Sequence, residues 1–188
     1  TEIYTLSLHD ALPISFRGPK LPVQNVTWDE SGHFLVALNK KFGEVFRLPT
    51  ETEWEYACRA GSESFYCFGD MASLLDEYAW FNKNSGQQPH EVSSKNPNAW
   101  SLFDMHGNVW EWCQDCYLHD YYTKSPIKDP MGVSMNKNAP KVCRGGSWKN
   151  VPSDLRCSMR HGESPSYRDS TLGFRALLVI SKNMRKKA

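Results

Sequence analysis

The first clear hydrophobic pattern predicts a helix over residues 28–41. Within it, Phe34, Leu35 and Leu38 recur at spacings of three and four residues, so they share one apolar face. Gly43 follows two lysines at the end of this pattern, which is the order that helix C-termini prefer. We therefore expect an amphipathic helix that packs its apolar face on the core.

A second helix is predicted directly after Thr50. Glu53 stands three residues beyond this threonine, and the two side chains are placed to form a capping box. Trp54 and Cys58 lie four residues apart and therefore on the same face of the helix. Gly61 is expected to end this helix, because glycine adopts the left-handed backbone that follows many helix C-termini.

Later in the chain, two short segments have the character of strands. Residues 141–148 read K-V-C-R-G-G-S-W, which predicts a strand that runs into a Gly-Gly turn. Residues 172–180 read L-G-F-R-A-L-L-V-I, which predicts a single closing strand. Turn-forming residues are frequent, with 12 glycines and 11 prolines, and 13% of the residues are aromatic. This pattern favours a loop-rich α+β domain, held by large aromatic side chains, over a helical bundle.

The charge of the chain argues against a general nucleic-acid surface. Its 22 basic and 21 acidic side chains give a net charge of +1, whereas such a surface shows a clustered basic excess. The one basic cluster of the sequence lies in residues 182–188 and is interpreted as a solvated C-terminal tail. No apolar run approaches the roughly 20 residues that a membrane-spanning helix needs. We therefore predict no nucleic-acid partner and no membrane span.

Residues 1–15 differ in character from the rest of the chain and are predicted to be a non-native leader. They lack the basic start and the continuous apolar stretch of a signal peptide, so the sequence leaves the localisation open. The six cysteines lack the tight spacing of a small secreted scaffold, which favours reduced thiols. A length of 188 residues suits one domain, which we place at residues 16–181.

Four motifs follow one another in a fixed order. R-L-P-T-E-T-E-W-E-Y-A begins at Arg47, and N-A-W-S-L-F-D-M-H-G-N-V-W-E-W covers residues 98–112. R-G-G-S-W begins at Arg144, and L-G-F-R begins at Leu172. Together these motifs resemble the formylglycine-generating enzyme (sulfatase-modifying factor) family, and the resemblance covers residues 21–180.

The resemblance implies a C-type-lectin-like variant of the α+β class, with little regular secondary structure. Members of the family begin with a further stretch before the position of Pro22, so we expect the N-terminal part of the domain to be missing. The strand at residues 172–180 is then expected to lack a neighbour. The resemblance also implies a relation to enzymes that oxidise a protein cysteine to formylglycine. Two other functions stay open, a catalytically silent binding or regulatory module and a ligand-display module on the same fold.

In the family, the segment that matches residues 103–112 binds Ca²⁺. Carried over by position, Asp104 and Glu111 would supply side-chain oxygens, and Gly107 and Val109 would supply backbone carbonyls. Such a set suits calcium, which takes about 6–8 oxygen ligands. The alternative is structural, with Asp104 capping a turn and Glu111 paired with a buried arginine.

Active members of the family hold copper(I) between two thiolates, a soft-ligand arrangement that suits this metal. Cys157, in the string R-C-S-M-R, matches the region of the second active cysteine and is the catalytic candidate. Its partner should lie five residues earlier, where this chain has Pro152. We therefore expect the two-cysteine copper site to be incomplete and Cys157 to be a small core residue.

The loop of residues 149–171 is the candidate surface for ligands. In the related fold it lies on the ligand-facing side, and recognition usually depends on surface loops of a fixed scaffold. Arg156, Arg160 and His161 are the candidate substrate-binding residues, for a protein or peptide ligand or an anionic group, and Tyr167 and Arg168 are further candidates. The alternative is that Arg160 and Arg175 form structural ion pairs with the glutamate-rich helix that follows Thr50.

Overall fold

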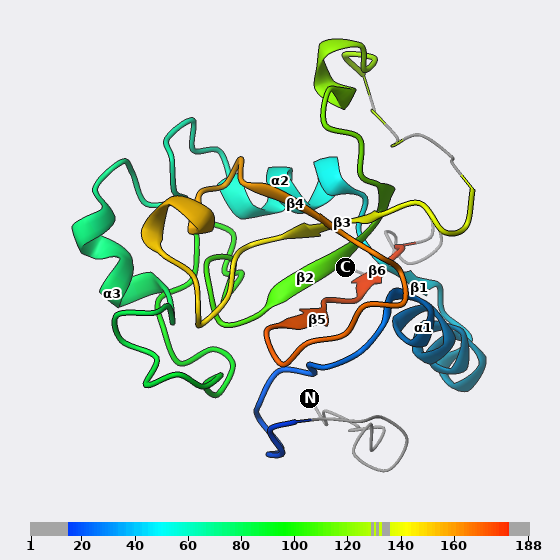
Figure 1. The fold of residues 1–188 in the computed structure, drawn as a ribbon, viewed down its shortest axis with the longest axis horizontal. Coiled ribbons are helices and arrows are strands. Elements are labelled where there is room, and N and C mark those ends of the chain that lie inside the picture. Colours follow the sequence, from blue (N-terminus) through cyan, green and yellow to red (C-terminus); the bar gives the residue numbers. More distant parts are fainter. Residues whose placement is uncertain (1–14, 129, 131, 133–135, 181–188) are drawn as a thin grey trace.

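The computed structural model describes residues 15–128, 130, 132 and 136–180. The predicted tail at residues 182–188 lies outside these ranges, and so does the predicted leader apart from Ser15. Within them, the chain is an α+β domain in which long loops connect short helices and strands (Figure 1). The loop-rich α+β class predicted from the sequence is thereby confirmed.

Short elements make up the regular part of the domain. The helices are α1 (Trp28–Phe42), α2 (Glu51–Arg59) and α3 (Leu75–Tyr78), and the 3-10 turns are η2 (Ala72–Leu74), η3 (Tyr121–Thr123) and η4 (Pro152–Leu155). The strands are β1 (Phe46–Arg47), β2 (Trp110–Cys116), β3 (Lys141–Arg144), β4 (Arg160–Glu163), β5 (Leu172–Phe174) and β6 (Leu177–Leu178). In the described ranges, no helix has the length and apolar character needed to cross a membrane.

The strands form two separate sheets. Four of them lie in the order β4-β3-β2-β5, whereas β1 and β6 pair with each other. Strand β2 runs antiparallel to β3 and parallel to β5, and a bulge interrupts its register between Trp112 and Cys116. Helix α2 contacts β2 and β3 above the middle of the sheet, while α1 lies beside β1 on the right of Figure 1. Buried side chains of both helices pack against the four-stranded sheet.

Helix α1 matches the predicted helix to within one residue at its C-terminus. The Thr27 side chain accepts from the Glu30 amide, and the Glu30 side chain accepts from the Thr27 amide, which forms a capping box. Gly43 ends the helix with a left-handed φ of 68°. The helix buries Leu35 in a core cluster that also contains Trp112 of β2. Local caps and apolar spacing are therefore sufficient to define this element.

Helix α2 begins as predicted and ends one residue before the predicted glycine. Thr50 and Glu53 form the expected capping box, and the Glu51 amide also donates to the Asp115 carboxylate over 2.7 Å. Ala60, with φ of 46°, occupies the left-handed position that was predicted for Gly61. The predicted end of the helix was therefore wrong by one residue. The last helical hydrogen bond runs from the Ala60 amide to the Tyr56 carbonyl.

The single strand predicted at residues 172–180 is instead two strands in different sheets. β5 pairs with β2 in parallel, and β6 pairs with β1 in antiparallel orientation. Between them, Arg175 turns inward and donates to the Glu111 carboxylate and to the Phe103 carbonyl. This anchor explains the break, and the predicted ion pair of Arg175 with the helix after Thr50 was wrong, because Arg175 pairs with Glu111 of β2. In the described sheet, β5 is an edge strand, and the Asn25 amide donates to the Leu172 carbonyl over 2.9 Å.

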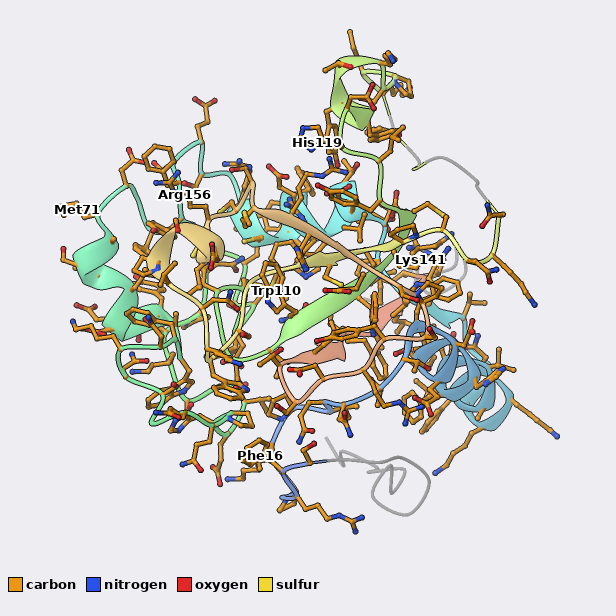
Figure 2. The ribbon with its side chains drawn as sticks, viewed as in Figure 1. Phe16, Met71, Trp110, His119, Lys141 and Arg156 are labelled. Carbon is orange, nitrogen blue, oxygen red and sulfur yellow. The ribbon has the colours of Figure 1, made fainter. Side chains whose placement is uncertain are left out.

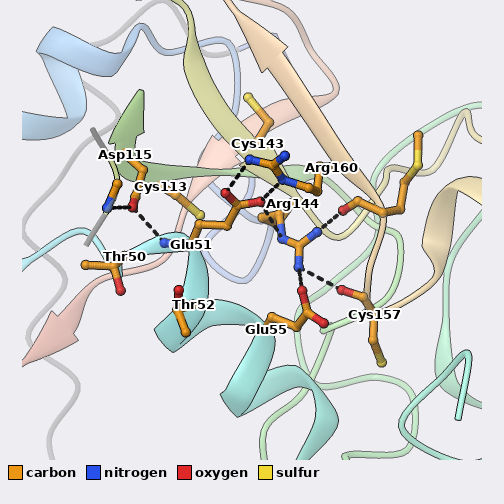
Figure 3. A network of polar contacts seen from close by, with 12 residues as sticks. Thr50, Glu51, Thr52, Glu55, Cys113, Asp115, Cys143, Arg144, Cys157 and Arg160 are labelled. Carbon is orange, nitrogen blue, oxygen red and sulfur yellow. Dashed lines mark hydrogen bonds and ion pairs between the residues drawn. The ribbon is translucent and has the colours of Figure 1, made fainter. Parts of the chain in front are cut away.

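A buried ion network joins α2 to the four-stranded sheet (Figure 3). Arg144 of β3 has no exposed surface, and its guanidinium donates to the Glu55 carboxylate and, over 2.9 Å, to the Cys157 carbonyl. Arg160 of β4 donates to the Glu51 carboxylate over 2.8 Å. Because Glu51 is only 1% exposed, this pair holds β4 against the start of α2. The structural alternative for Arg160 therefore describes its main contact.

Candidate ligand pocket and metal-binding residues

The turn between residues 103 and 109 is clamped by two backbone hydrogen bonds. The Gly107 amide donates to the Gly145 carbonyl, and the Asn108 amide donates to the Trp80 carbonyl, each over 2.8 Å. Asp104, Gly107 and Asn108 all have left-handed φ values, at 57°, 76° and 61°. A methyl group on Gly107 would lie 2.2 Å from the Trp80 carbonyl oxygen. Only glycine fits this position without a shift of the backbone.

The turn brings the four predicted calcium ligands to one cavity of about 420 Å³. Asp104, Gly107, Val109 and Glu111 all line it. Burial raises the pKa of the Asp104 carboxyl, although the Ser93 amide donates to this carboxylate over 2.8 Å. A bound cation would favour the ionised form that burial disfavours. Two carboxylates and the adjoining backbone carbonyls are a donor set of the kind that fits Ca²⁺.

Glu111 is already engaged in an ion pair. Arg175 donates to both oxygens of its carboxylate, through Nε and through Nη2, each over 2.8 Å. The Trp54 indole donates to the same carboxylate over 2.7 Å. The predicted alternative of an arginine partner for Glu111 is thus present, although Arg175 keeps 30% of its side chain exposed and is not buried. A cation would share Glu111 with Arg175.

Cys157 is buried in the core and has a thiol partner that the sequence did not predict. It has no exposed surface, and its Sγ lies 3.6 Å from Sγ of Cys58, which is equally buried on α2. The hydrogen bond from the Cys58 thiol lowers the pKa of Cys157 to about 5, whereas burial raises the pKa of Cys58. Pro152, the position expected for the partner, begins the 3-10 turn η4. The partner of Cys157 therefore comes from α2, across the core, and not from the loop that contains Cys157.

A polar pocket of about 180 Å³ lies beside β4. Its walls come from all four strands of the larger sheet and from the loops around them. Its lining residues are Trp110, Cys143, Ser147, Lys149, Asn150, His161, Glu163, Tyr167, Thr171 and Leu172. Asn150 organises one wall, because its Oδ1 accepts from the Trp110 indole over 3.0 Å and from the Ser147 hydroxyl over 2.6 Å. Trp110 is labelled near the middle of the domain in Figure 2.

His161 is the one residue of the three predicted ligand contacts that lines this pocket. Its Nε2 lies 3.0 Å from the Glu163 carboxylate, and its ring centroid is 5.6 Å from that of Trp110. Arg160 is its neighbour on β4, and successive side chains of a strand point to opposite faces, so Arg160 faces Glu51. Arg156 lies over the Phe65 ring, 4.5 Å from its centroid, elsewhere on the surface (Figure 2).

Two further residues of the predicted ligand loop line the pocket, Lys149 and Tyr167. Tyr167 was among the further predicted contacts, whereas Lys149 was not, because nothing in its local sequence separates it from the other polar residues of the loop. Cys143 also lines the pocket, and burial raises the pKa of its thiol well above the ordinary value. The thiol in this pocket is therefore protonated at neutral pH.

Known proteins resemble this chain over most of its length. The sulfatase-modifying factor enzyme 1-like domain matches residues 7–180. A Chlamydia pneumoniae protein named serine/threonine-protein kinase pkn1 is 35% identical over 164 residues, which are 86% of this chain and 25% of the relative. The formylglycine-generating enzyme of Streptomyces coelicolor is 34% identical over 174 residues, which cover 84% of this chain and 52% of that enzyme.

Solved structures share the fold as well. Treponema denticola variable protein 1 superposes with a TM-score of 0.82 at 29% identity, covering 88% of this chain and 76% of that one. The chain spans only a quarter of the relative named as a kinase and about half of the Streptomyces enzyme. The shared part is thus a domain found in proteins with different names.

Proposed function

Since the chain belongs to the sulfatase-modifying factor enzyme 1-like family, we propose that it is a binding member, which takes a small polar ligand beside His161 and does not generate formylglycine. The pocket is the observation that carries the binding proposal. The burial of Cys157 and Cys58 supports the second part of the proposal, that the protein does not oxidise a substrate cysteine. The alternative within the family is a divergent oxidase that acts on a protein cysteine.

The placement of Cys157 argues against the oxidase. The family resemblance implies that a substrate cysteine reaches copper held between two thiolates. Here Cys157 and its partner Cys58 have no exposed surface, so a peptide cannot touch either sulfur without opening the core. The accessible pocket contains a single thiol, Cys143, and burial keeps it protonated by raising its pKa. These residues therefore do not fit a two-thiolate copper site open to a substrate.

The side chains around the pocket suit an anionic group on a small ligand or at a peptide end. Lys149 lines the pocket and takes part in no ion pair among the described residues, whereas the carboxylate in the lining, Glu163, lies 3.0 Å from Nε2 of His161. The imidazole of His161 and the phenol of Tyr167 border the same space. An ammonium group and nearby hydrogen-bonding rings are suited to bind a carboxylate through charge-assisted hydrogen bonds. The volume of about 180 Å³ matches one residue-sized group.

A pair of short peptides tests this proposal. N-acetyl-triglycine and its C-terminal amide are titrated into the protein while the imidazole resonances of His161 are followed by NMR. We expect the acid to shift these resonances and the amide to bind about 10–100-fold more weakly, since a hydrogen bond to a charged group contributes roughly 1.5–3 kcal/mol. Lys149→Gln should remove the difference. Lys124→Gln, which breaks only a surface pair with Asp120, is the matched control.

The binding proposal fails if neither peptide moves the His161 resonances. It also fails if Lys149→Gln and Lys124→Gln bind the acid equally well. A ligand-display role, the other function that the family resemblance leaves open, predicts binding in the same pocket but does not require a carboxylate on the ligand. Equal binding of the acid and the amide would favour that role.

We also propose Ca²⁺ as a structural cation of the turn at residues 103–112. The convergence of Asp104, Gly107, Val109 and Glu111 on one cavity supports it. The test is thermal unfolding after chelator treatment, with and without added CaCl₂. We expect calcium to raise the Tm of the wild type and of the surface control Asp120→Asn, but not of Asp104→Asn. An identical Tm with calcium and with chelator would rule out the site.

A further inference from the structure

A second set of metal-binding side chains lies in the core, apart from the turn's carboxylates. Cys58, His106 and Cys157 come from α2, from the clamped turn and from the segment after η4. One ligand atom from each lies within 4.8 Å of the others. Cys58 Sγ is 3.6 Å from Cys157 Sγ and 4.0 Å from His106 Nε2. In the described part of the chain, no other three such side chains converge in this way.

The imidazole of His106 has the orientation of a metal-binding histidine. Its Nδ1 lies 2.7 Å from the Leu155 carbonyl, which can only accept, so Nδ1 carries the proton. Its Nε2 accepts from the Cys67 amide over 3.1 Å and faces the Cys58 thiol. A backbone carbonyl on the far ring nitrogen is the usual support of a ligating histidine, because it fixes both the tautomer and the ring. The lone pair of Nε2 is therefore on the side of the Cys58 thiol, and a metal ion would replace the Cys67 amide as its partner.

We propose that Cys58, His106 and Cys157 bind a thiophilic metal ion, with Zn²⁺ as the expected occupant. Tetrahedral zinc, with Zn–S of about 2.3 Å and Zn–N of about 2.0–2.1 Å, holds two sulfurs about 3.8 Å apart and a sulfur and a nitrogen about 3.6 Å apart. The observed separations of 3.6 and 4.0 Å are close to these values. Two sulfurs and an imidazole select a soft or borderline cation over Ca²⁺ or Mg²⁺.

Cys67 is the fourth ligand in this proposal. Its thiol and its backbone amide both border His106, and it is the only partly exposed cysteine, whereas the other five are buried. Its side chain must turn inward, which exchanges the amide–imidazole hydrogen bond for two bonds to the metal. Because Cys67 is partly exposed, the metal ion would enter the site past this residue. Structural zinc sites with three cysteines and one histidine have this composition.

The charge of such a site is offset by the surroundings. Three thiolates and Zn²⁺ carry one net negative charge, and binding releases the thiol protons to solvent. The guanidinium groups of Arg59 and Arg144 are close enough to act electrostatically on Cys157 and Cys58. Buried charge of this kind is tolerated where it is paired. The two arginines therefore stabilise the metal-bound state.

Cobalt and zinc titration of the whole 188-residue chain tests the site. The protein is reduced, treated with chelator and titrated anaerobically with Co²⁺. We expect one Co²⁺ per chain with thiolate-to-metal charge-transfer absorption and tetrahedral d–d bands, followed by displacement by one Zn²⁺. Cys58→Ser and Cys157→Ser should each weaken zinc binding more than about a hundredfold, since loss of an outer-shell partner alone costs roughly 10–100-fold. Cys143→Ser, equally buried outside the cluster, is the matched control.

A measurement on the wild type covers the case in which the serine variants do not fold. Bound Zn²⁺ should slow the alkylation of Cys67 in the native protein, because the ion holds its thiolate. Absence of the charge-transfer band, or an unchanged alkylation rate at Cys67, would overturn the proposal. So would a Cys58–Cys157 disulfide that persists in the purified protein, since the two sulfurs would then bind each other.

Discussion

Replacing Gly107 by alanine tests whether the clamped turn is as tight as the structure indicates. Gly86 is the comparison, because it also has a left-handed φ, 59° against 76°, but an added methyl group meets nothing within 4 Å. Both substitutions impose the left-handed penalty of about 1–2 kcal/mol on alanine. Both also restrict the unfolded chain to the same extent, so this effect cancels in the comparison. The difference between the two variants therefore isolates the contact.

At Gly107, the new methyl group would lie 2.2 Å from the Trp80 carbonyl oxygen, which is well inside contact distance. Forcing an extra carbon into a packed site costs about 1–3 kcal/mol. We expect Gly107→Ala to be less stable than Gly86→Ala by that amount, which corresponds to a Tm lower by roughly 2–12 °C for a chain of this size. Urea unfolding, followed by tryptophan fluorescence, measures the difference. Equal destabilisation of the two variants would refute the reasoning.

Three further outcomes follow from the titrating and charged groups. Burial raises the pKa of Asp104 above its unfolded value, so the protonated carboxyl stabilises the fold at low pH and this contribution is lost as the pH rises through the folded pKa. Calcium binds the ionised form, so its effect on Tm should grow with pH over the same interval, and a pH-independent effect would contradict the assignment. Arg160→Gln should cost at most about 3–5 kcal/mol, because it removes the bidentate partner of the buried Glu51 carboxylate and leaves only the Arg144 guanidinium, whose Nε lies 3.7 Å away. The double variant with Glu51→Gln should recover part of this loss in chemical denaturation, and strict additivity would argue against the pair. Arg156→Gln should cost no more than about 1 kcal/mol, since it removes the contact with the half-exposed Phe65 ring and one hydrogen bond to Tyr66.

Elements that depend on nearby residues were predictable from the sequence. Helix α1 follows from its apolar spacing and from Gly43, and α2 follows from the capping box of Thr50 and Glu53. The left-handed backbone at Gly107 follows from the glycine itself. Four motifs in order identified the family, which the comparison confirms over residues 7–180. The incomplete N-terminal part of the domain stays a prediction.

Contacts between distant segments were not predictable in the same way. The split of residues 172–180 into β5 and β6 depends on Arg175 reaching Glu111, and these residues lie far apart in the sequence. The pairing of Cys58 with Cys157 joins α2 to a loop across the core. A single sequence contains no periodic signal for either contact. The prediction that Arg160 and His161 contact the same ligand failed for a different reason. Neighbouring side chains of a strand point to opposite faces of the sheet, so only His161 lines the pocket.

The candidate sites also combine features that the sequence predicts with contacts that only the folded chain shows. The family motif placed Asp104, Gly107, Val109 and Glu111 on one turn, and the structure brings all four to one cavity. Their role as calcium ligands is still to be measured. His106 lies in the same motif, yet its burial and its contacts with Leu155 and Cys58 emerge only from the folded chain.

The most direct test of the central claim is a peptide oxidation assay. The reduced protein is incubated with copper, O₂, a thiol reductant and a C-x-P-x-R peptide, and the peptide is followed by mass spectrometry. Because Cys157 and Cys58 are closed to solvent and the pocket contains one protonated thiol, we predict that the peptide cysteine is not converted. Copper-dependent formation of formylglycine, lost in Cys157→Ser and retained in Cys143→Ser, would contradict the account and make the chain an oxidase of its family.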